Sequence, residues 1–335
     1  ECFILAPKTC QLLMLSATID APEKFASWVQ SLNDSKKVIH SHCKIRSVPL
    51  EHHLWITCYD SKIMDKKKKL DFDNNVNKLL PFKTSDGNFN DLNYHTVNKL
   101  LSYIYDNRIF VKRVHVYNTL INYLNENELL PAICFIYSRK NVERTANEIQ
   151  CKLVTVEESI KAEKEIKHVL KRLANWEEYF KMPQTQSLIK LINKGVGIHH
   201  SGMLPILREI VEILFSKGYI KLLFATETFA VGLNMPTKTA IFSSLSKFDG
   251  SSMRFLEPHE YTQQAGRAGR RGYDTRGHVI HLTNLFDLPD LQQYKRILSD
   301  RPQTLRSKFC FSYHLVLNTI KNAELKSIST SSLVK

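Results

Sequence analysis

"AICFIYSRKNVERTANEIQCKL", residues 132–153, decides the fold, because a short apolar run is followed directly by a polar stretch with helical periodicity. Six apolar residues in a row, 132–137, are typical of a strand that is buried on both faces of a sheet. The same alternation recurs along the chain, with further strands expected at 196–200, 220–226, 238–244 and 277–283 and helices at 204–218 and 257–269. This rhythm predicts an α/β fold, an open and mostly parallel sheet with helices on both faces.

Three other segments carry weaker patterns. The apolar run at 12–15 predicts a buried strand, followed by a helix that begins at Pro22. Residues 60 to about 93 are rich in lysine and asparagine and are expected to be a solvated insertion or linker. Residues 157–180 predict one long charged helix.

Composition favours a polyanionic partner. Lysine and arginine outnumber aspartate and glutamate by 47 to 33 in the 335 residues, for a net charge of +14. The seven cysteines are scattered and never form CxxC, so neither a disulfide framework nor a zinc site is expected, and the thiols indicate a reducing, intracellular compartment. No apolar stretch approaches the ~20 residues of a membrane span.

"QQAGRAGRRG", residues 263–272, concentrates positive charge among glycines. Functional loops of a parallel sheet leave the carboxyl ends of its strands, and we expect this stretch among them. If the helix at 257–269 continues through it, Gln263, Arg267 and Arg270 lie on one face, and Gly266 and Gly269 permit close approach of an anion. Arginine's planar, permanently charged fork suits the oxygens of a transferring phosphoryl group.

The order of the motifs resembles the helicase core of superfamily 2, and within it the superkiller-like DExH-box RNA helicases of the exosome-cofactor type. "LLMLSATI" resembles motif III, "ICFIYSRKNVE" motif IV, residues 195–236 motifs IVa and V, and "YTQQAGRAGRRGYDTRG" motif VI. "RPQTLRSKFCFSYHLVLNTI", residues 301–320, resembles the family's entry into its winged-helix domain.

The resemblance implies four regions: a remnant of the first RecA-like domain at 1–59, a lysine-rich insertion or linker at 60–112, the second RecA-like domain at 113–300, and the start of a winged-helix region at 301–335. The opening "ECFILAP" lacks an initiator methionine, and the chain is expected to start inside a domain.

The resemblance also implies roles for individual residues. Arg270 is expected to be the arginine finger at the γ-phosphate of ATP, Arg267 its companion and Gln263 a positioning residue. Further contacts to ATP are expected from Gly232 and Asn234. The residues expected to bind the RNA backbone are Ser138, Arg139, His200, Ser201, Gly202 and Thr226.

Two more assignments follow from the same resemblance. Ser16 and Thr18 are expected to couple the ATP state to closure of the two domains. His199 is expected to be structural and to point back into the sheet.

ATP hydrolysis also needs a glycine-rich phosphate loop and an acidic strand end that holds Mg²⁺. Neither GxxxxGK[ST] nor DExH occurs in this sequence. Both precede motif III in the family, so we expect the Mg²⁺ ligands in a first domain that is almost absent here. The intact parent would be an ATP-dependent RNA helicase using ATP and Mg²⁺, and this chain alone would hydrolyse nothing.

The expected partner is single-stranded RNA held by its backbone, with RNA-degradation machinery as a further partner, no membrane, and a monomeric chain in the nucleus or cytoplasm. Two alternatives remain: a superfamily 2 helicase that unwinds DNA, and a non-catalytic RNA-binding or interaction module. Residues 301–320 favour the RNA-processing branch, and the complete arginine pattern of 263–272 argues against a pure binding module.

Overall fold

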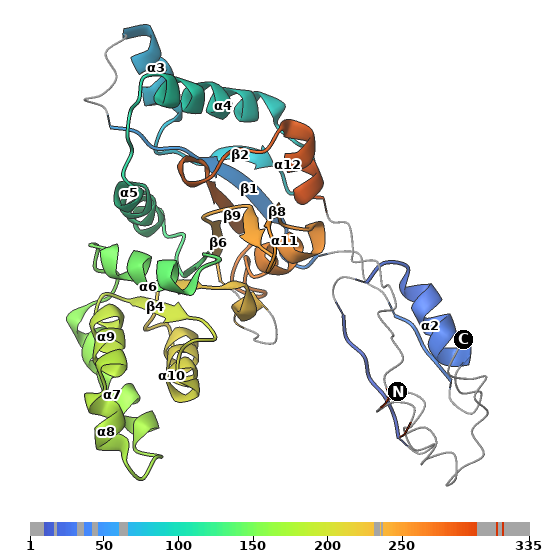
Figure 1. Cartoon of the computed structure of the whole chain (residues 1–335), viewed down its shortest axis with the longest axis vertical. Helices are drawn as coiled ribbons and strands as arrows, with labels where there is room; N and C mark the ends of the chain where they lie inside the picture. Colours follow the sequence, from blue (N-terminus) through green and yellow to red (C-terminus); the bar gives the residue numbers. More distant parts are fainter. Residues whose placement is uncertain are drawn as a thin grey trace. The chain divides into compact units, whose positions relative to one another are not determined.

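The structure is a computed structural model, and it describes residues 10–16, 19–31, 37–41, 46–59, 66–230, 235, 237–299, 313 and 317. The chain divides into two compact units, one made of residues 46–300 and the other of residues 1–45 with 301–335 (Figure 1).

The larger unit is built on a seven-stranded sheet. Its strands are β1 (Leu50–Trp55), β2 (Leu80–Lys83), β3 (Ala132–Phe135), β4 (Val196–His199), β5 (Leu222–Ala225), β6 (Thr239–Phe242) and β9 (Gly277–Leu282). They lie in the order β2-β1-β9-β6-β3-β5-β4, and all pairs are parallel except β1 with β2. A separate antiparallel hairpin joins β7 (Ser246–Phe248) to β8 (Met253–Phe255).

Helices cover both faces of the sheet, because apolar side chains of its strands are buried on both faces. In β3, Ala132 and Cys134 pack with α5 (Arg113–Glu126) and α6 (Arg139–Glu148). Ile133 and Phe135 belong to the opposite core. That core includes residues of α3 (Lys66–Asn75), α4 (Asp91–Asp106), α7 (Val156–Leu170), α9 (Pro183–Ile192), α10 (Pro205–Ser216), α11 (Pro258–Ala265) and α12 (Leu291–Ile297).

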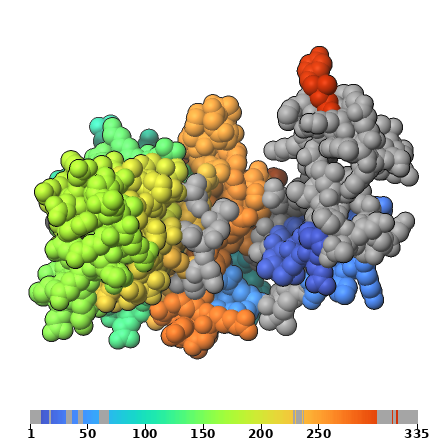
Figure 2. All heavy atoms as spheres, turned by 90° about the horizontal axis from the view of Figure 1, so that it is seen from below, coloured from blue at the N-terminus to red at the C-terminus, as the bar shows by residue number. Residues whose placement is uncertain are grey.

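Figure 2 shows the surface of α7, α8 (Trp176–Lys181) and α9 in yellow-green adjoining that of α10 in yellow. The predicted α/β class, the parallel sheet and its two helical layers are therefore confirmed.

Cys58 and Cys134 are buried free thiols, in line with the reduced cysteines expected from the sequence. Among the described residues, no helix combines the length and apolar character needed to cross a membrane.

The expected boundary at residue 59 is wrong. Strand β1 pairs in parallel register with β9 from Leu50↔Gly277 to Trp55↔Leu282, so residues 50–55 belong to the same sheet as 113–300. The expected linker is also part of this unit, since β2 pairs with β1 and α4 buries Val97 and Leu100. The polar composition of 60–93 hid the few apolar residues, such as Phe72 and Phe82, that fix it to the core.

Two more expectations fail. Residues 11–16 have no regular structure, and Leu13 and Leu15 are 86% and 87% exposed. A parallel strand needs neighbouring strands, and none of the strands named here comes from the described part of the smaller unit, whose one named helix is α2 (Pro22–Ser31). The expected long helix at 157–180 is divided into α7 and α8 by a turn that follows Leu170.

Candidate functional site

The glycine- and arginine-rich segment lies at the amino ends of the strands. Residues 266–276, which we call the arginine turn, connect the end of α11 to the start of β9. The turn contacts Thr237, just before β6, through hydrogen bonds from Thr237 N–H to the Arg267 carbonyl and from Gly269 N–H to the Thr237 carbonyl. The expectation that this stretch leaves a carboxyl end is wrong, because α11 runs back across the sheet before the turn begins.

Gln263, Arg267 and Arg270 do not share one helical face. α11 ends at Ala265, with Gly266 as its C-cap, so Arg267 and Arg270 lie beyond it. Gly269 has φ +86°, a left-handed conformation that interrupts any continuation of the helix. Exposed Gln263 therefore lies on α11, while half-buried Arg267 and Arg270 are displayed by the turn.

Arg46 holds the arginine turn in place. Its Nη2 donates to the carbonyls of Gly266, at 2.9 Å, and Ala268, at 2.8 Å, and its Nε donates to Val48. Gly269 packs so closely against Val48 that a Cβ at position 269 would lie 2.5 Å from Val48 Cγ1. The turn is thus fixed by a guanidinium and by contact with the segment that leads into β1.

Arg270 is preorganised by Asp274. Its Nε and Nη2 donate to the two carboxylate oxygens at 2.8 and 2.9 Å, and the Arg270 N–H donates to the same carboxylate. Hydrogen bonding to Asp274 raises the pKa of Arg270, whereas burial lowers the pKa of Arg267. Both guanidiniums remain charged at neutral pH.

Helix α11 is anchored by buried hydrogen bonds. The Tyr261 hydroxyl lies 2.5 Å from Nδ1 of His52 and 2.9 Å from Nε2 of His281, on β1 and β9. Burial lowers the pKa of His281 to about 3, so this imidazole is neutral at physiological pH. Tyr137, which follows β3, donates from its hydroxyl to Gln264 Oε1 at 2.8 Å and so ties the loop after β3 to α11.

A second group of predicted residues lies at the carboxyl ends of β3, β4 and β5. Ser138 is the N-cap of α6 and accepts from the Asn141 N–H at 3.4 Å. Arg139 is exposed in the first turn of α6, and its Cδ would be 3.4 Å from a Cβ at Gly202. The structure therefore brings the loop after β3 and the loop after β4 together.

The two histidines after Ile198 are both buried. His199 Nε2 lies 2.8 Å from Glu212 Oε1, which confirms its expected structural role. His200 is 2% exposed, its Nε2 lies 3.1 Å from Glu143 Oε1, and its Nδ1 accepts from the Gly202 N–H. The His200 side chain thus shapes the loop, and the exposed atoms of this loop come from Ser201 and Gly202.

Thr226 follows β5 at the same carboxyl edge of the sheet and contacts the end of β4. Its N–H donates to the His199 carbonyl at 3.2 Å, and the residue is 9% exposed. Burial lowers the pKa of both His199 and His200, against the opposing effect of Glu212 and Glu143.

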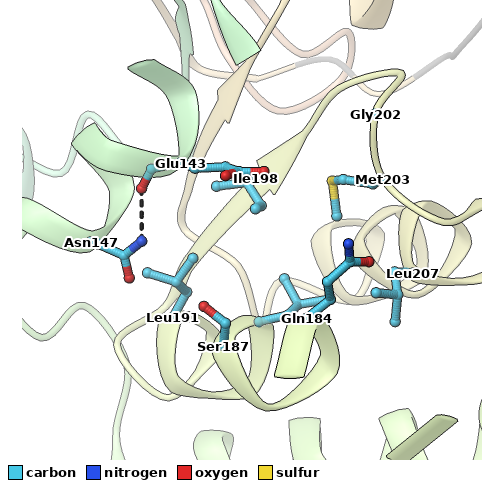
Figure 3. A pocket seen from close by; sticks show the side chains of 10 residues that line it. Glu143, Asn147, Gln184, Ser187, Leu191, Ile198, Gly202, Met203 and Leu207 are labelled. Carbon is cyan, nitrogen blue, oxygen red and sulfur yellow. Dashed lines mark hydrogen bonds between the residues drawn. The ribbon is translucent and has the colours of Figure 1, made fainter. Parts of the chain in front are cut away.

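Two hollows adjoin these loops. One of about 120 Å³ lies between α6, α9 and the loop after β4, and polar Glu143, Gln184 and Ser187 line it together with apolar Met203 and Leu207 (Figure 3). A larger one of about 420 Å³ opens beside Ser138 and Asn141, with Lys247 of β7 in its wall. One hollow therefore adjoins the loop after β4 and the other the loop after β3.

Several predicted residues lie outside the described part of the chain: Gly232, Asn234 and Thr18. So does the expected winged-helix start at 301–335, except Tyr313 and Leu317. Ser16 is described and is exposed in the smaller unit.

The sequence did not indicate the residues that keep the site residues in position. Arg46 lies 220 positions before Gly266, and no local pattern marks it. Asp274 stands four residues after Arg270, a spacing that could have been read as an ion pair. Tyr137 directly precedes Ser138, but its bond to Gln264 depends on the order of strands in the sheet.

Taken together, the parallel sheet, its two helical layers and the arginine turn define a RecA-like helicase C-terminal domain. Residues 156–272 match the family described as the helicase conserved C-terminal domain.

Similar proteins identify the branch. The chain is 34% identical over 335 residues to Superkiller complex protein 2 of Homo sapiens, with 96% of this chain and 26% of that protein covered. It is 33% identical over 335 residues to Exosome RNA helicase MTR4 of Homo sapiens, with 97% and 30% covered. It is 32% identical over 330 residues to DExH-box ATP-dependent RNA helicase DExH9 of Arabidopsis thaliana, with 97% and 32% covered.

This chain carries the C-terminal helicase region of a superkiller-like superfamily 2 helicase. It spans about a third or less of the length of these curated relatives.

Proposed function

We propose that this chain supplies the second RecA-like domain of an ATP-dependent RNA helicase. In this role the arginine turn completes an ATP site whose phosphate loop and Mg²⁺ ligands belong to a first RecA-like domain. The loops at the carboxyl ends of β3, β4 and β5 hold the backbone of single-stranded RNA.

The observation that carries the proposal is the preorganised arginine turn. Two guanidiniums are displayed on a turn that Arg46, Thr237 and the left-handed Gly269 hold rigid, and Asp274 orients Arg270 from behind. A transferring phosphoryl group is stabilised most by charges that are already in position, and an arginine finger contributes about 10³–10⁵ in rate. Arg270 is the finger in this proposal and Arg267 its companion at the γ-phosphate.

RNA binding is supported by the chemistry of the opposite edge. The Ser138 hydroxyl, the Arg139 guanidinium and the free N–H groups at the start of α6 face solvent beside Ser201 and Gly202. Helix amino termini and exposed arginines favour phosphate, and none of these groups is arranged to read base edges. Binding is therefore expected to tolerate any sequence and to weaken with salt.

The test is RNA-stimulated ATP hydrolysis. It should be measured on the 335-residue chain alone and on the chain fused behind a first RecA-like domain that carries a phosphate loop and a DExH sequence. We expect no hydrolysis by the chain alone, and RNA-dependent turnover by the fusion that Arg270→Ala abolishes and that the matched charge loss Arg271→Ala leaves largely intact. Turnover by the chain alone, or equal losses in both variants, would contradict the assignment.

A competition between RNA and DNA strands of equal length decides the substrate. The relatives reported above are named as RNA helicases or for the superkiller complex, and this supports RNA and RNA-degradation partners for this chain. A clear preference for DNA would instead favour a DNA-unwinding enzyme of the same superfamily.

A further inference from the structure

Three side chains that can bind a metal meet on one face of the sheet, directly beside the end of the arginine turn. Glu51 and His53 are two residues apart on β1 and therefore point to the same face. His278 on β9 is the parallel partner of Glu51, so its side chain joins them from the neighbouring strand. Figure 1 shows β1 and β9 running side by side.

The spacing of the two imidazoles matches a tetrahedral zinc ion. Nδ1 of His278 lies 3.4 Å from Nε2 of His53. Bonds of about 2.0–2.1 Å around a tetrahedral Zn²⁺ separate neighbouring nitrogen ligands by about 3.3–3.4 Å. A carboxylate oxygen of Glu51 lies 4.0 Å from Nε2 of His53, and one ligand atom from each of the three residues lies within 4.8 Å of the others.

The His53 ring can present Nε2 to a metal ion. Zinc binds the neutral form of an imidazole, whose proton then resides on the other ring nitrogen. Nδ1 of His53 has no hydrogen-bond partner in the described part of the chain, so the ring proton can reside there and leave Nε2 to coordinate.

Neighbouring charges leave the site usable. Arg276 donates to Oε1 of Glu51 at 2.6 Å, which orients the carboxylate and leaves Oε2 toward His53, in the manner of the outer-shell partners of metal ligands. Lys238 is a positive charge near His278, but its ammonium donates to the carbonyl of Glu128. Asp274 adds a compensating negative charge near His278.

We propose that Glu51, His53 and His278 bind one Zn²⁺ ion, with water in the fourth position. Two imidazoles and one carboxylate form a ligand set that zinc accepts readily, whereas Mg²⁺ prefers oxygen ligands. The ion joins β1 to its neighbour β9, which are the first and the last strands of the sheet in chain order. It thereby reinforces β9 directly after the arginine turn.

The experiment uses the whole 335-residue chain and Zn²⁺ alone. Metal content after equilibration and dialysis, and isothermal titration, should give about one Zn²⁺ per chain. Zn²⁺ at a hundredfold excess over its Kd should raise the Tm by about 5–10 °C, whereas Mg²⁺ should not shift it. His53→Gln and His278→Gln should each abolish binding, Glu51→Gln should weaken it, and the matched loss of an exposed imidazole in His95→Gln should leave it unchanged.

Bound Co²⁺ gives a readout that does not depend on the folding of any variant. Tetrahedral nitrogen and oxygen ligation gives visible absorption bands without thiolate-to-metal charge transfer. Absence of stoichiometric binding, charge-transfer bands from cysteine, or full binding in both histidine variants would overturn the proposal.

Discussion

Replacement of Gly269 by alanine tests how the arginine turn is held. Gly269 has φ +86°, a conformation that costs an L-residue about 1–2 kcal/mol. Its added Cβ would also lie 2.5 Å from Cγ1 and 3.1 Å from Cβ of Val48, a stiff and buried side chain. Overpacking of this kind costs a further ~1–3 kcal/mol.

Gly272 provides a matched control in the same turn. Its φ is +82°, but a Cβ there would have no atom within 4 Å. Gly272→Ala therefore carries the backbone strain alone, and the reduced entropy of the unfolded chain returns about 0.4–1 kcal/mol in both variants. We expect Gly272→Ala to cost about 1 kcal/mol and Gly269→Ala to cost about 2–4 kcal/mol of unfolding free energy.

Urea unfolding followed by circular dichroism and tryptophan fluorescence measures both costs, since Trp55 is fully buried in the sheet. The difference should appear as a lower midpoint with an unchanged slope. In the double variant Val48→Ala/Gly269→Ala the two costs should not add, because the small side chain at 48 removes the closest contact; a coupling of about 1 kcal/mol is expected. Equal costs for Gly269→Ala and Gly272→Ala, within about 0.5 kcal/mol, would refute the packing argument.

Three further outcomes follow from the described contacts. Tyr137→Phe leaves the buried Gln264 oxygen without its donor and should cost about 1–2 kcal/mol in urea unfolding, whereas the exposed Tyr105→Phe should cost nothing measurable. Burial raises the pKa of Glu260, but hydrogen bonds from Arg254 and Lys247 outweigh it and hold the pKa at about 2. Glu260→Gln should therefore lower the free energy of unfolding by about 1 kcal/mol at pH 7, after allowance for solvent screening. This loss should fade as the pH falls from 4.5 towards 2, because the carboxylate of the original protein is then protonated. Arg139→Gln should weaken RNA binding several-fold and reduce the salt slope of the affinity by about 0.7, while the similarly exposed Arg144→Gln on the same helix should change neither.

The sequence predicts the central sheet well because short apolar runs indicate its buried strands. Every residue of β3 and of β5 is buried, and a polar residue follows each strand within three positions, Ser138 after β3 and Thr226 after β5. The same signal fails at 12–15, where an equally apolar run is exposed. A run of this kind indicates that a segment can form a buried strand, but it does not indicate which other strands and helices would cover it.

The candidate site is predictable in its residue types and not in its geometry. The sequence predicts that Gly266 and Gly269 lie on a helix and permit close approach of an anion, although glycine after a helical pattern also signals a C-terminus. Arg46 and the pairing of Glu51 with His278 depend on contacts between residues more than 200 positions apart. Such contacts follow from strand order and register, which local patterns do not encode.

The arginine turn and the loops that follow β3, β4 and β5 lie at opposite edges of the same sheet, which has a mechanical consequence. Strands β3, β5 and β6 have four residues each, so their two ends lie about 13 Å apart. Close-packed protein interiors have low compressibility and transmit strain. In the proposed function, a displacement of the arginine turn on loss of the γ-phosphate would therefore be passed through the sheet to the loops at its carboxyl edge, and so to the bound RNA.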